Sequence, residues 1–344
     1  MNNIKDDVKE YYGRVLNGTK DLKTKACCCS ADSLPKEVKD ALNLIDDEII
    51  SHYYGCGSPI PPLLDGMTVL DLGCGSGRDV YVVSKLVGEN GHVIGIDMTQ
   101  EQLDIAKRHE ESQKERFGYE KSNVDFRQGY IEDLASAGIA DESVDIVISN
   151  CVINLSPYKQ EIFDEIWRVL KPGGELYFSD VFADRRIPEE LIRDPILHGE
   201  CISGAMYYED FRRVMSKAGF ADFRYMSVRE IDLGNKEIEE KVGFATFTER
   251  TVRAFKLEEL EDICEDYGQV AIYNGSIPGH PHSFALDDHH NFITGKPMLV
   301  CGNTASMVSE TRFRDAFTLI GDRSTHYGAF DCAPADAPEG SCCC

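Results

Sequence analysis

Apolar residues along the first two thirds of the chain form short continuous runs that alternate with stretches of helical spacing. The runs cover residues 69–72, 92–97, 124–126, 144–149, 175–181 and 223–228. The helical stretches begin near residue 79 and continue over 100–117, 162–170 and 211–218. Regular alternation of strand and helix is typical of a parallel sheet with helices on both faces. The pattern therefore predicts an α/β, doubly wound domain, which we place at residues 59–245.

The segments on either side of this domain are patterned differently. Residues 1–58 are polar, carry a cysteine cluster and predict a helix from about residue 34 to 50, which we interpret as an N-terminal helical extension. Beyond residue 245, short apolar runs at 270–273 and 296–300 predict a smaller C-terminal α+β domain over 246–340, followed by a Cys-rich tail at 341–344. Histidine pairs in two of its loops, 279–282 and 287–290, fit either a metal site or solvated loops.

A glycine-rich turn follows the first predicted strand. Gly73 and Gly75 lack a Cβ, which lets the backbone approach a ligand closely. A dinucleotide-binding turn needs a third glycine at position 78, where this chain has Arg78. The second strand ends in Asp97, which is placed to accept hydrogen bonds from ribose hydroxyls. The turn thus predicts a nucleoside-containing cofactor other than a dinucleotide, with a purely structural turn as the alternative.

The spacing Asp71-x-Gly73-x-Gly75-x-Gly77 resembles motif I of the class I methyltransferases that use S-adenosylmethionine. This resemblance implies that Asp71 faces the methionine end of the cofactor. It also implies that Ile131, after the third strand, packs on the adenine and that the neighbouring Glu132 contacts the exocyclic amine.

Charge and cysteine content narrow the range of partners. The net charge is −24, so nucleic acids and anionic membranes would be repelled. The polar first residues do not resemble a signal peptide, and no apolar run approaches the ~20 residues of a membrane span. We expect a cytoplasmic protein. In that reducing compartment the thirteen cysteines are not expected to form a disulfide framework, and they point to metal or metalloid binding or to thiol chemistry.

Three cysteines lie in loops that are expected to open toward the cofactor. Cys151 directly follows the fourth strand, Cys201 lies beyond the fifth, and Cys56 stands between two glycines. Ligands of an open α/β sheet bind beyond the carboxyl ends of its strands. Trivalent arsenic is a soft centre that selects sulfur ligands, and its lone pair needs no base to expose it. For Cys151, a small core residue is the alternative interpretation.

With these cysteines and the cofactor motif together, the chain resembles the arsenite methyltransferases. The matching stretches are residues 53–57, 71–79, 95–99, 149–155, 174–181 and 199–201. The resemblance implies methyl transfer from S-adenosylmethionine to thiolate-bound trivalent arsenic. It implies four catalytic cysteines, namely Cys27, Cys56, Cys151 and Cys201, of which the last three bind As(III). Cys28 and Cys29 remain alternatives to Cys27.

The same resemblance assigns further contacts and partners. It implies that Tyr54, Met98 and Asn150 contact the cofactor, and that thioredoxin or glutathione serves as the thiol reductant. We expect a monomer. Two other functions remain open. One is methylation of an organic metabolite by an enzyme whose cysteines are structural. The other is non-enzymatic sequestration of arsenic or a metal.

Overall fold

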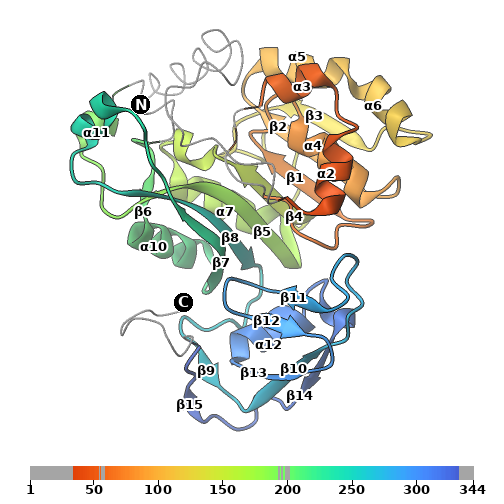
Figure 1. Cartoon of the computed structure of the whole chain (residues 1–344), viewed down its shortest axis with the longest axis vertical. Coiled ribbons are helices and arrows are strands. Elements are labelled where there is room, and N and C mark those ends of the chain that lie inside the picture. Colours follow the sequence, from red (N-terminus) through yellow and green to blue (C-terminus); the bar gives the residue numbers. More distant parts are fainter. Residues whose placement is uncertain are drawn as a thin grey trace.

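The computed structural model describes residues 34–53, 55, 59–192, 194, 197 and 202–332. Its largest sheet has the strand order β3-β2-β1-β4-β5-β8-β7, with β6 beside β5 (Figure 1). The strands are β1 Thr68–Leu72, β2 His92–Asp97, β3 Val124–Gln128, β4 Val144–Asn150, β5 Leu170–Ala183, β6 Met206–Tyr207, β7 Phe223–Glu230 and β8 Phe247–Phe255. Strands β1 to β5 are parallel and β8 is antiparallel to β5 and β7. The predicted doubly wound α/β sheet is confirmed.

Helices cover both faces of this sheet. They are α2 Lys36–Leu42, α3 Asp47–Ser51, α4 Arg78–Val87, α5 Gln100–Arg108, α6 Glu110–Phe117, α7 Lys159–Val169, α8 Glu189–Ile192, α10 Tyr208–Ala218 and α11 Lys236–Val242. Alternate residues of β1 face opposite sides, as strand geometry requires. Val69 packs into the core shared with α2, α4 and α5, and Leu70 into the core shared with α7 and α10.

Two predicted helices are divided in the structure. The stretch predicted as one helix over 100–117 breaks at His109, whose Nε2 lies 2.6 Å from Glu48 Oε2 of α3. The helix predicted over 34–50 is likewise two helices, and Asp46 caps the second by accepting a hydrogen bond from the Glu48 backbone N–H. Residues 171–174, which lie between the predicted helix at 162–170 and the predicted strand at 175–181, belong to the first part of β5.

The expected domain boundary at residue 245 is too early. Strand β8 pairs with β5 and β7, so the large sheet continues to Phe255. The charged side chains of β8 interrupt its apolar pattern, so the sequence did not predict a strand there. Glu249 pairs with Arg229, and Arg253 pairs with Glu175 at 2.5 Å, which allows these charged residues to lie in a mostly buried strand.

The C-terminal domain is built from small sheets. It contains β9 Glu265–Asp266, β10 Gln269–Tyr273, β11 Ser283–Ala285, β12 Asn291–Ile293, β13 Pro297–Val300, α12 Gly302–Ser309, β14 Phe317–Ile320 and β15 Gly328–Ala329. Strands β13, β10 and β14 form one sheet, and β11–β12 and β9–β15 form two pairs. The strands predicted at 270–273 and 296–300 are confirmed. The 341–344 tail and the 27–29 cysteines lie outside the described residues.

None of the helices in the described part of the chain is long and apolar enough to cross a membrane.

Candidate functional site

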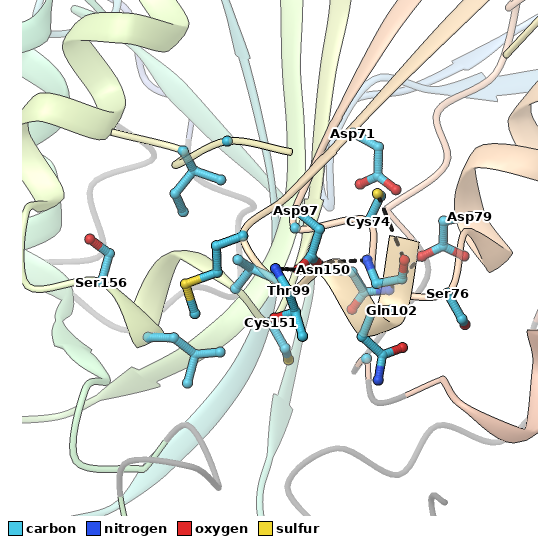
Figure 2. Close-up of a pocket in the computed structure, with 18 of the residues that line it drawn as sticks. Asp71, Cys74, Ser76, Asp79, Asp97, Thr99, Gln102, Asn150, Cys151 and Ser156 are labelled. Atoms are coloured by element: carbon cyan, nitrogen blue, oxygen red, sulfur yellow. Dashed lines mark hydrogen bonds between the residues drawn. The ribbon is translucent and has the colours of Figure 1, made fainter. Parts of the chain in front are cut away.

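A pocket opens at the carboxyl ends of β1, β2 and β4, where the strand order reverses between β1 and β4 (Figure 2). This is the place where open α/β sheets bind ligands. The pocket brings together nine residues singled out from the sequence: Asp71, Gly73, Gly75, Asp97, Met98, Ile131, Glu132, Asn150 and Cys151. Elements far apart in the chain thus contribute to one wall.

The turn after β1 depends on its glycines. Gly73, Gly75 and Gly77 have φ angles of +72°, +52° and +88°, which L side chains rarely adopt. The Gly73 N–H donates to the Ile96 carbonyl at 2.7 Å, which ties the turn to β2. A Cβ at Gly73 would lie 2.4 Å from the Val152 side chain, whereas one at Gly75 would meet no atom within 4 Å. Gly73 is therefore needed for packing, and Gly75 leaves room in the pocket.

Asp97 joins the glycine turn to the end of β2. One carboxylate oxygen accepts from the Gly75 N–H and the other from the Thr99 N–H, both at 2.8 Å. Burial raises the pKa of Asp97, and these backbone donors oppose the rise. The carboxylate is fixed in place before any ligand enters, which is the arrangement a ribose site needs.

Negative charge converges in the pocket. Asp71 is buried, and burial together with the charges of Asp79 and Asp97 raises its pKa well above the ordinary value. The same factors, burial first and then Asp97 and Asp71, raise the pKa of the Cys74 thiol well above its usual range. A ligand with a sulfonium and an ammonium group would relieve this repulsion. The residues present therefore fit S-adenosylmethionine, and they hold Cys74 as a neutral thiol.

Asn150 connects the end of β4 to the start of α4. Its Nδ2 donates to Asp79 Oδ2 at 3.0 Å and also contacts the Tyr53 hydroxyl. The Arg78 guanidinium lies 3.8 Å above the Tyr53 ring. Within the described residues, the buried Asn150 Oδ1 accepts no hydrogen bond. That oxygen is an acceptor available to a bound donor.

Cys151 is the first residue beyond β4 and is only 3% exposed. Its backbone has φ +56°, a left-handed conformation that costs a non-glycine residue roughly 1–2 kcal/mol. Its N–H donates to the Ser179 carbonyl at 2.9 Å, which holds the residue beside β5. Its sulfur is in a disulfide in this structure. Strain of this kind is concentrated at functional sites.

Asp180 supports the segment that follows Cys151. It accepts from the Asn154 backbone N–H at 3.1 Å and from Asn154 Nδ2 at 2.7 Å. Burial raises the pKa of Asp180 to about 6, although hydrogen bonds from Val181 and Asn154 oppose the rise. These bonds fix the 3₁₀ turn η4 Ile153–Leu155, whose last residue lines the pocket.

Comparisons with known proteins identify the family. A sequence profile described as a methyltransferase domain matches residues 63–219, and one described as an arsenite methyltransferase C-terminal domain matches residues 267–341. The arsenite methyltransferase of Aquipseudomonas alcaligenes is 52% identical over 326 residues, which are 95% of this chain and 93% of that protein. The chain belongs to the arsenite methyltransferase family.

Other arsenite methyltransferases are also similar over most of the chain. The human protein is 43% identical over 324 residues, which are 93% of this chain and 85% of the human one. A crystal structure of CrArsM, an arsenic(III) S-adenosylmethionine methyltransferase from Chlamydomonas reinhardtii, has a TM-score of 0.84 and 52% identity. That match covers 87% of this chain and all of the other. The predicted family is confirmed.

Four residues predicted for the arsenite methyltransferase site lie outside the described residues: Cys27, Tyr54, Cys56 and Cys201. Their assignments stay predictions. The structure adds pocket residues that the sequence did not single out, among them Tyr53, Asp79, Thr99 and Gln102. Asp79 lies just after the glycine turn and Thr99 just after β2, so their positions in the sequence could have identified them as pocket residues. Tyr53 enters from the N-terminal segment, in the matching stretch 53–57, where the sequence assigned a cofactor contact to the neighbouring Tyr54.

The histidine pairs, for which the sequence left a metal site and solvated loops open, are only partly brought together. Ligand atoms of Asp287, His289 and His290 lie within 4.8 Å of one another. The Asp287 carboxylate, however, already receives His290 Nδ1 at 2.8 Å and the Arg224 guanidinium at 3.5 Å. The ring of His280, from the other pair, packs against Phe284 at 5.8 Å between centroids. For these histidines, both interpretations stay open.

Proposed function

We propose that this chain is an S-adenosylmethionine-dependent arsenite methyltransferase. It transfers methyl groups to thiolate-bound trivalent arsenic and gives methylated and dimethylated arsenicals. One observation carries the proposal. A cysteine, Cys151, stands at the wall of the cofactor pocket where β4 ends, held in a strained backbone conformation.

Arsenic chemistry fits a thiol at this position. A trivalent arsenic atom bound to sulfur is pyramidal and keeps an exposed lone pair, so the nucleophile needs no proton removed at the moment of transfer. S-adenosylmethionine supplies an electrophilic methyl group on its sulfonium. The chain's task is to orient the lone pair toward that methyl and to keep water out.

The chain's residues take distinct roles in this proposal. Asp97 holds the ribose, Asp71 and Asn150 face the methionine end, and Ile131 and Glu132 flank the adenine. Met98 and Tyr54 complete the cofactor contacts. The arsenic ligands are Cys151, Cys201 and Cys56, and Cys27 joins for loading and redox turnover.

A thiol reductant, thioredoxin or glutathione, completes the proposed cycle. The disulfide at Cys151 supports it, because the sulfur must be reduced before it can bind arsenic. We further propose that the protein acts as a monomer in the cytoplasm, without nucleic acid or membrane. The net charge of −24 supports the last two absences.

Arsenic speciation tests the proposal. The full chain is incubated with arsenite, S-adenosylmethionine and a thiol reductant, and the arsenic species are separated by chromatography. We expect mono- and dimethylated arsenic that depends on both the methyl donor and the reductant. Cofactor consumption that is independent of arsenite, with no methylated arsenic, would instead indicate an enzyme that methylates an organic metabolite.

The variant Cys151→Ser tests the role of the sulfur in the same assay. It keeps the size and burial of the side chain but removes the soft donor, so methylation should fall below detection. Binding of S-adenosylmethionine, measured by calorimetry, should stay within about twofold because Cys151 is not among the polar groups that hold the cofactor. Cys201→Ser should behave in the same way. Retained turnover in either variant would contradict the arsenic ligand set.

A further inference from the structure

Three cysteines of the C-terminal domain lie together, and none of them lines the pocket. Cys264 precedes β9 and Cys332 follows β15, so the pairing of these two strands brings the cysteines side by side. The Phe330 N–H donates to the Cys264 carbonyl at 2.8 Å, which extends the pairing to the cysteine itself. Cys301 is the N-cap of α12. The three sulfurs lie within 4.8 Å of one another, and all three are free of disulfides.

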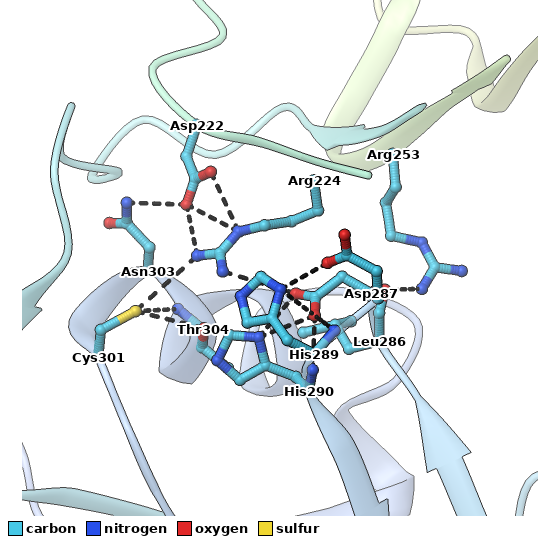
Figure 3. A network of polar contacts seen from close by, with 11 residues as sticks. Asp222, Arg224, Arg253, Leu286, Asp287, His289, His290, Cys301, Asn303 and Thr304 are labelled. Atoms are coloured by element: carbon cyan, nitrogen blue, oxygen red, sulfur yellow. Dashed lines mark hydrogen bonds and ion pairs between the residues drawn. The ribbon is translucent and has the colours of Figure 1, made fainter. Parts of the chain in front are cut away.

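The surroundings of Cys301 stabilise a thiolate. Its sulfur is fully buried and accepts from the Thr304 backbone N–H at 3.4 Å, at the positive end of α12 (Figure 3). The Arg224 guanidinium lies 3.8 Å from the same sulfur. Hydrogen bonds from Cys264 and Cys332, and then the charge of Arg224, hold the pKa of Cys301 far below its usual range.

Charge balance limits what the three sulfurs can hold. Arg224 is buried and already shared by two buried carboxylates, with Asp222 at 2.7 Å and Asp287 at 3.5 Å. Further buried negative charge would therefore lack a full counter-charge, and burying such charge is costly. A ligand that leaves the group neutral suits the site better than one that leaves it anionic.

We propose that Cys264, Cys301 and Cys332 form a second binding site for trivalent arsenic, separate from the methyl-transfer pocket. In the binding step, three As–O bonds of arsenous acid break and three As–S bonds form. Cys264 and Cys332 each give up a thiol proton, which leaves with a hydroxyl group as water. The Cys301 thiolate displaces the third hydroxyl group, which takes a proton from solvent, so three waters are released. No electron is transferred and the product is neutral. The site goes beyond the proposed methyltransferase activity, because none of these cysteines takes part in it.

The donor set favours arsenic over zinc. A structural zinc ion takes four ligands, and no fourth His, Cys, Asp or Glu in the described chain joins this group. Zinc held by three thiolates would also carry a net negative charge beside Asp222 and Asp287. Sulfur atoms bound to one zinc ion lie about 3.8 Å apart. The three sulfurs, which lie within 4.8 Å of one another, therefore need only a small inward movement to bind one central atom. Cys332 is half-buried and lies just beyond the two-residue strand β15, where few backbone hydrogen bonds oppose such a movement.

Protection of Cys332 from alkylation tests the site in the full chain. The protein is reduced with a phosphine, treated with iodoacetamide with or without arsenite, and alkylation of Cys332 is quantified by peptide mass mapping. Arsenite should slow alkylation of Cys332 by about tenfold or more, because only the free thiolate reacts. In Cys264→Ser or Cys301→Ser, protection at the same arsenite concentration should fall below about twofold, since two sulfurs hold arsenic less tightly than three.

Two controls separate this site from the others. Cys74→Ser removes a buried free thiol that is not part of the three-cysteine group, so arsenite should still protect Cys332 from alkylation. The double variant Cys151→Ser/Cys201→Ser removes the proposed reaction centre, and protection should again persist. Loss of methylation with intact protection would thus bear on the reaction centre alone.

Three results would overturn the second site. The first is unchanged alkylation of Cys332 when arsenite is present. The second is full protection in both Cys264→Ser and Cys301→Ser, with folding verified by circular dichroism. The third is protection by Zn²⁺ but not by arsenite, which would make the group a zinc site. Should Cys301→Ser fail to fold, Cys264→Ser decides alone.

Discussion

The conformation of one residue, Cys151, connects the fold to the chemistry. If β4 continued in an extended conformation beyond Asn150, Cys151 would be a further residue of the sheet. The left-handed turn at φ +56° instead ends β4 at the pocket wall. The cost of roughly 1–2 kcal/mol is offset by the bond to Ser179 and by packing against Val181 and Ala183. The apolar surroundings also agree with the core-residue interpretation, so burial and function coincide here.

The strain at Cys151 predicts an unusual order of stability. Cys151→Gly should be about 1 kcal/mol more stable than Cys151→Ala, because glycine adopts the left-handed conformation without penalty. Chemical denaturation of the two variants measures the difference. At Ser149, in the extended part of β4, the order should be reversed: Ser149→Ala should be more stable than Ser149→Gly by about 0.5–1 kcal/mol. The same order at both positions would mean that Cys151 is not strained.

The element that the sequence predicts best is the glycine turn. Its spacing, together with Asp97 at the end of the second predicted strand, indicated a nucleoside cofactor, because backbone conformation at Gly73 and Gly75 is a local property that sequence encodes directly. The turn η4 could not be predicted in this way. It is held by Asp180, which lies 26 residues after Asn154, and such long-range hydrogen bonds leave no periodic signal.

Two glycines of this turn should respond differently to alanine. Gly73→Ala should destabilise the protein by about 2 kcal/mol or more, since the new methyl collides with Val152 and the backbone is strained. Gly75→Ala has free space and should cost only about 1–2 kcal/mol of strain. It should nevertheless weaken S-adenosylmethionine binding at least tenfold, because its methyl occupies the pocket. Equal losses of stability, measured by thermal unfolding, would contradict this difference.

Asp180 should make stability depend on pH. Its folded pKa of about 6 exceeds the ordinary 3.8, so the folded state holds the proton more tightly than the unfolded state. The resulting stabilisation, about 3 kcal/mol, is complete below pH 3.8 and is lost as the pH rises through 6. Asp180→Asn cannot titrate. The difference in unfolding free energy between variant and wild type should therefore move by about 2 kcal/mol in favour of the variant between pH 4 and pH 7. A constant difference would refute the raised pKa.

At the scale of the whole molecule, buried charges fasten the C-terminal domain to the sheet. Glu175 of β5 pairs with Arg253 of β8 and with Arg312 of the C-terminal domain, and all three side chains are nearly or fully buried. The Arg253 guanidinium also donates to the Leu286 carbonyl. The sequence could predict that a second domain exists from its change in pattern. It could not predict the junction, because a buried arginine looks like a surface residue until its partner is known.

Removing the shared carboxylate should therefore destabilise both domains together. Glu175→Gln leaves two buried arginines without a counter-charge and should cost about 3–5 kcal/mol of unfolding free energy. Asp40→Asn, which breaks the exposed pair with Lys36, is the control and should cost less than about 1 kcal/mol. An unfolding free energy of Glu175→Gln within about 1 kcal/mol of the wild type would mean that Glu175 does not hold the domains together.

The central claim is that Cys151 presents arsenic to the methyl donor. The most direct test is a crystal structure of the reduced protein with arsenite and S-adenosylhomocysteine, which cannot donate a methyl group. We predict arsenic bonded to the sulfur of Cys151, with its open side toward the cofactor sulfur at the glycine turn. An unligated Cys151 sulfur pointing away from the occupied cofactor pocket would contradict the account.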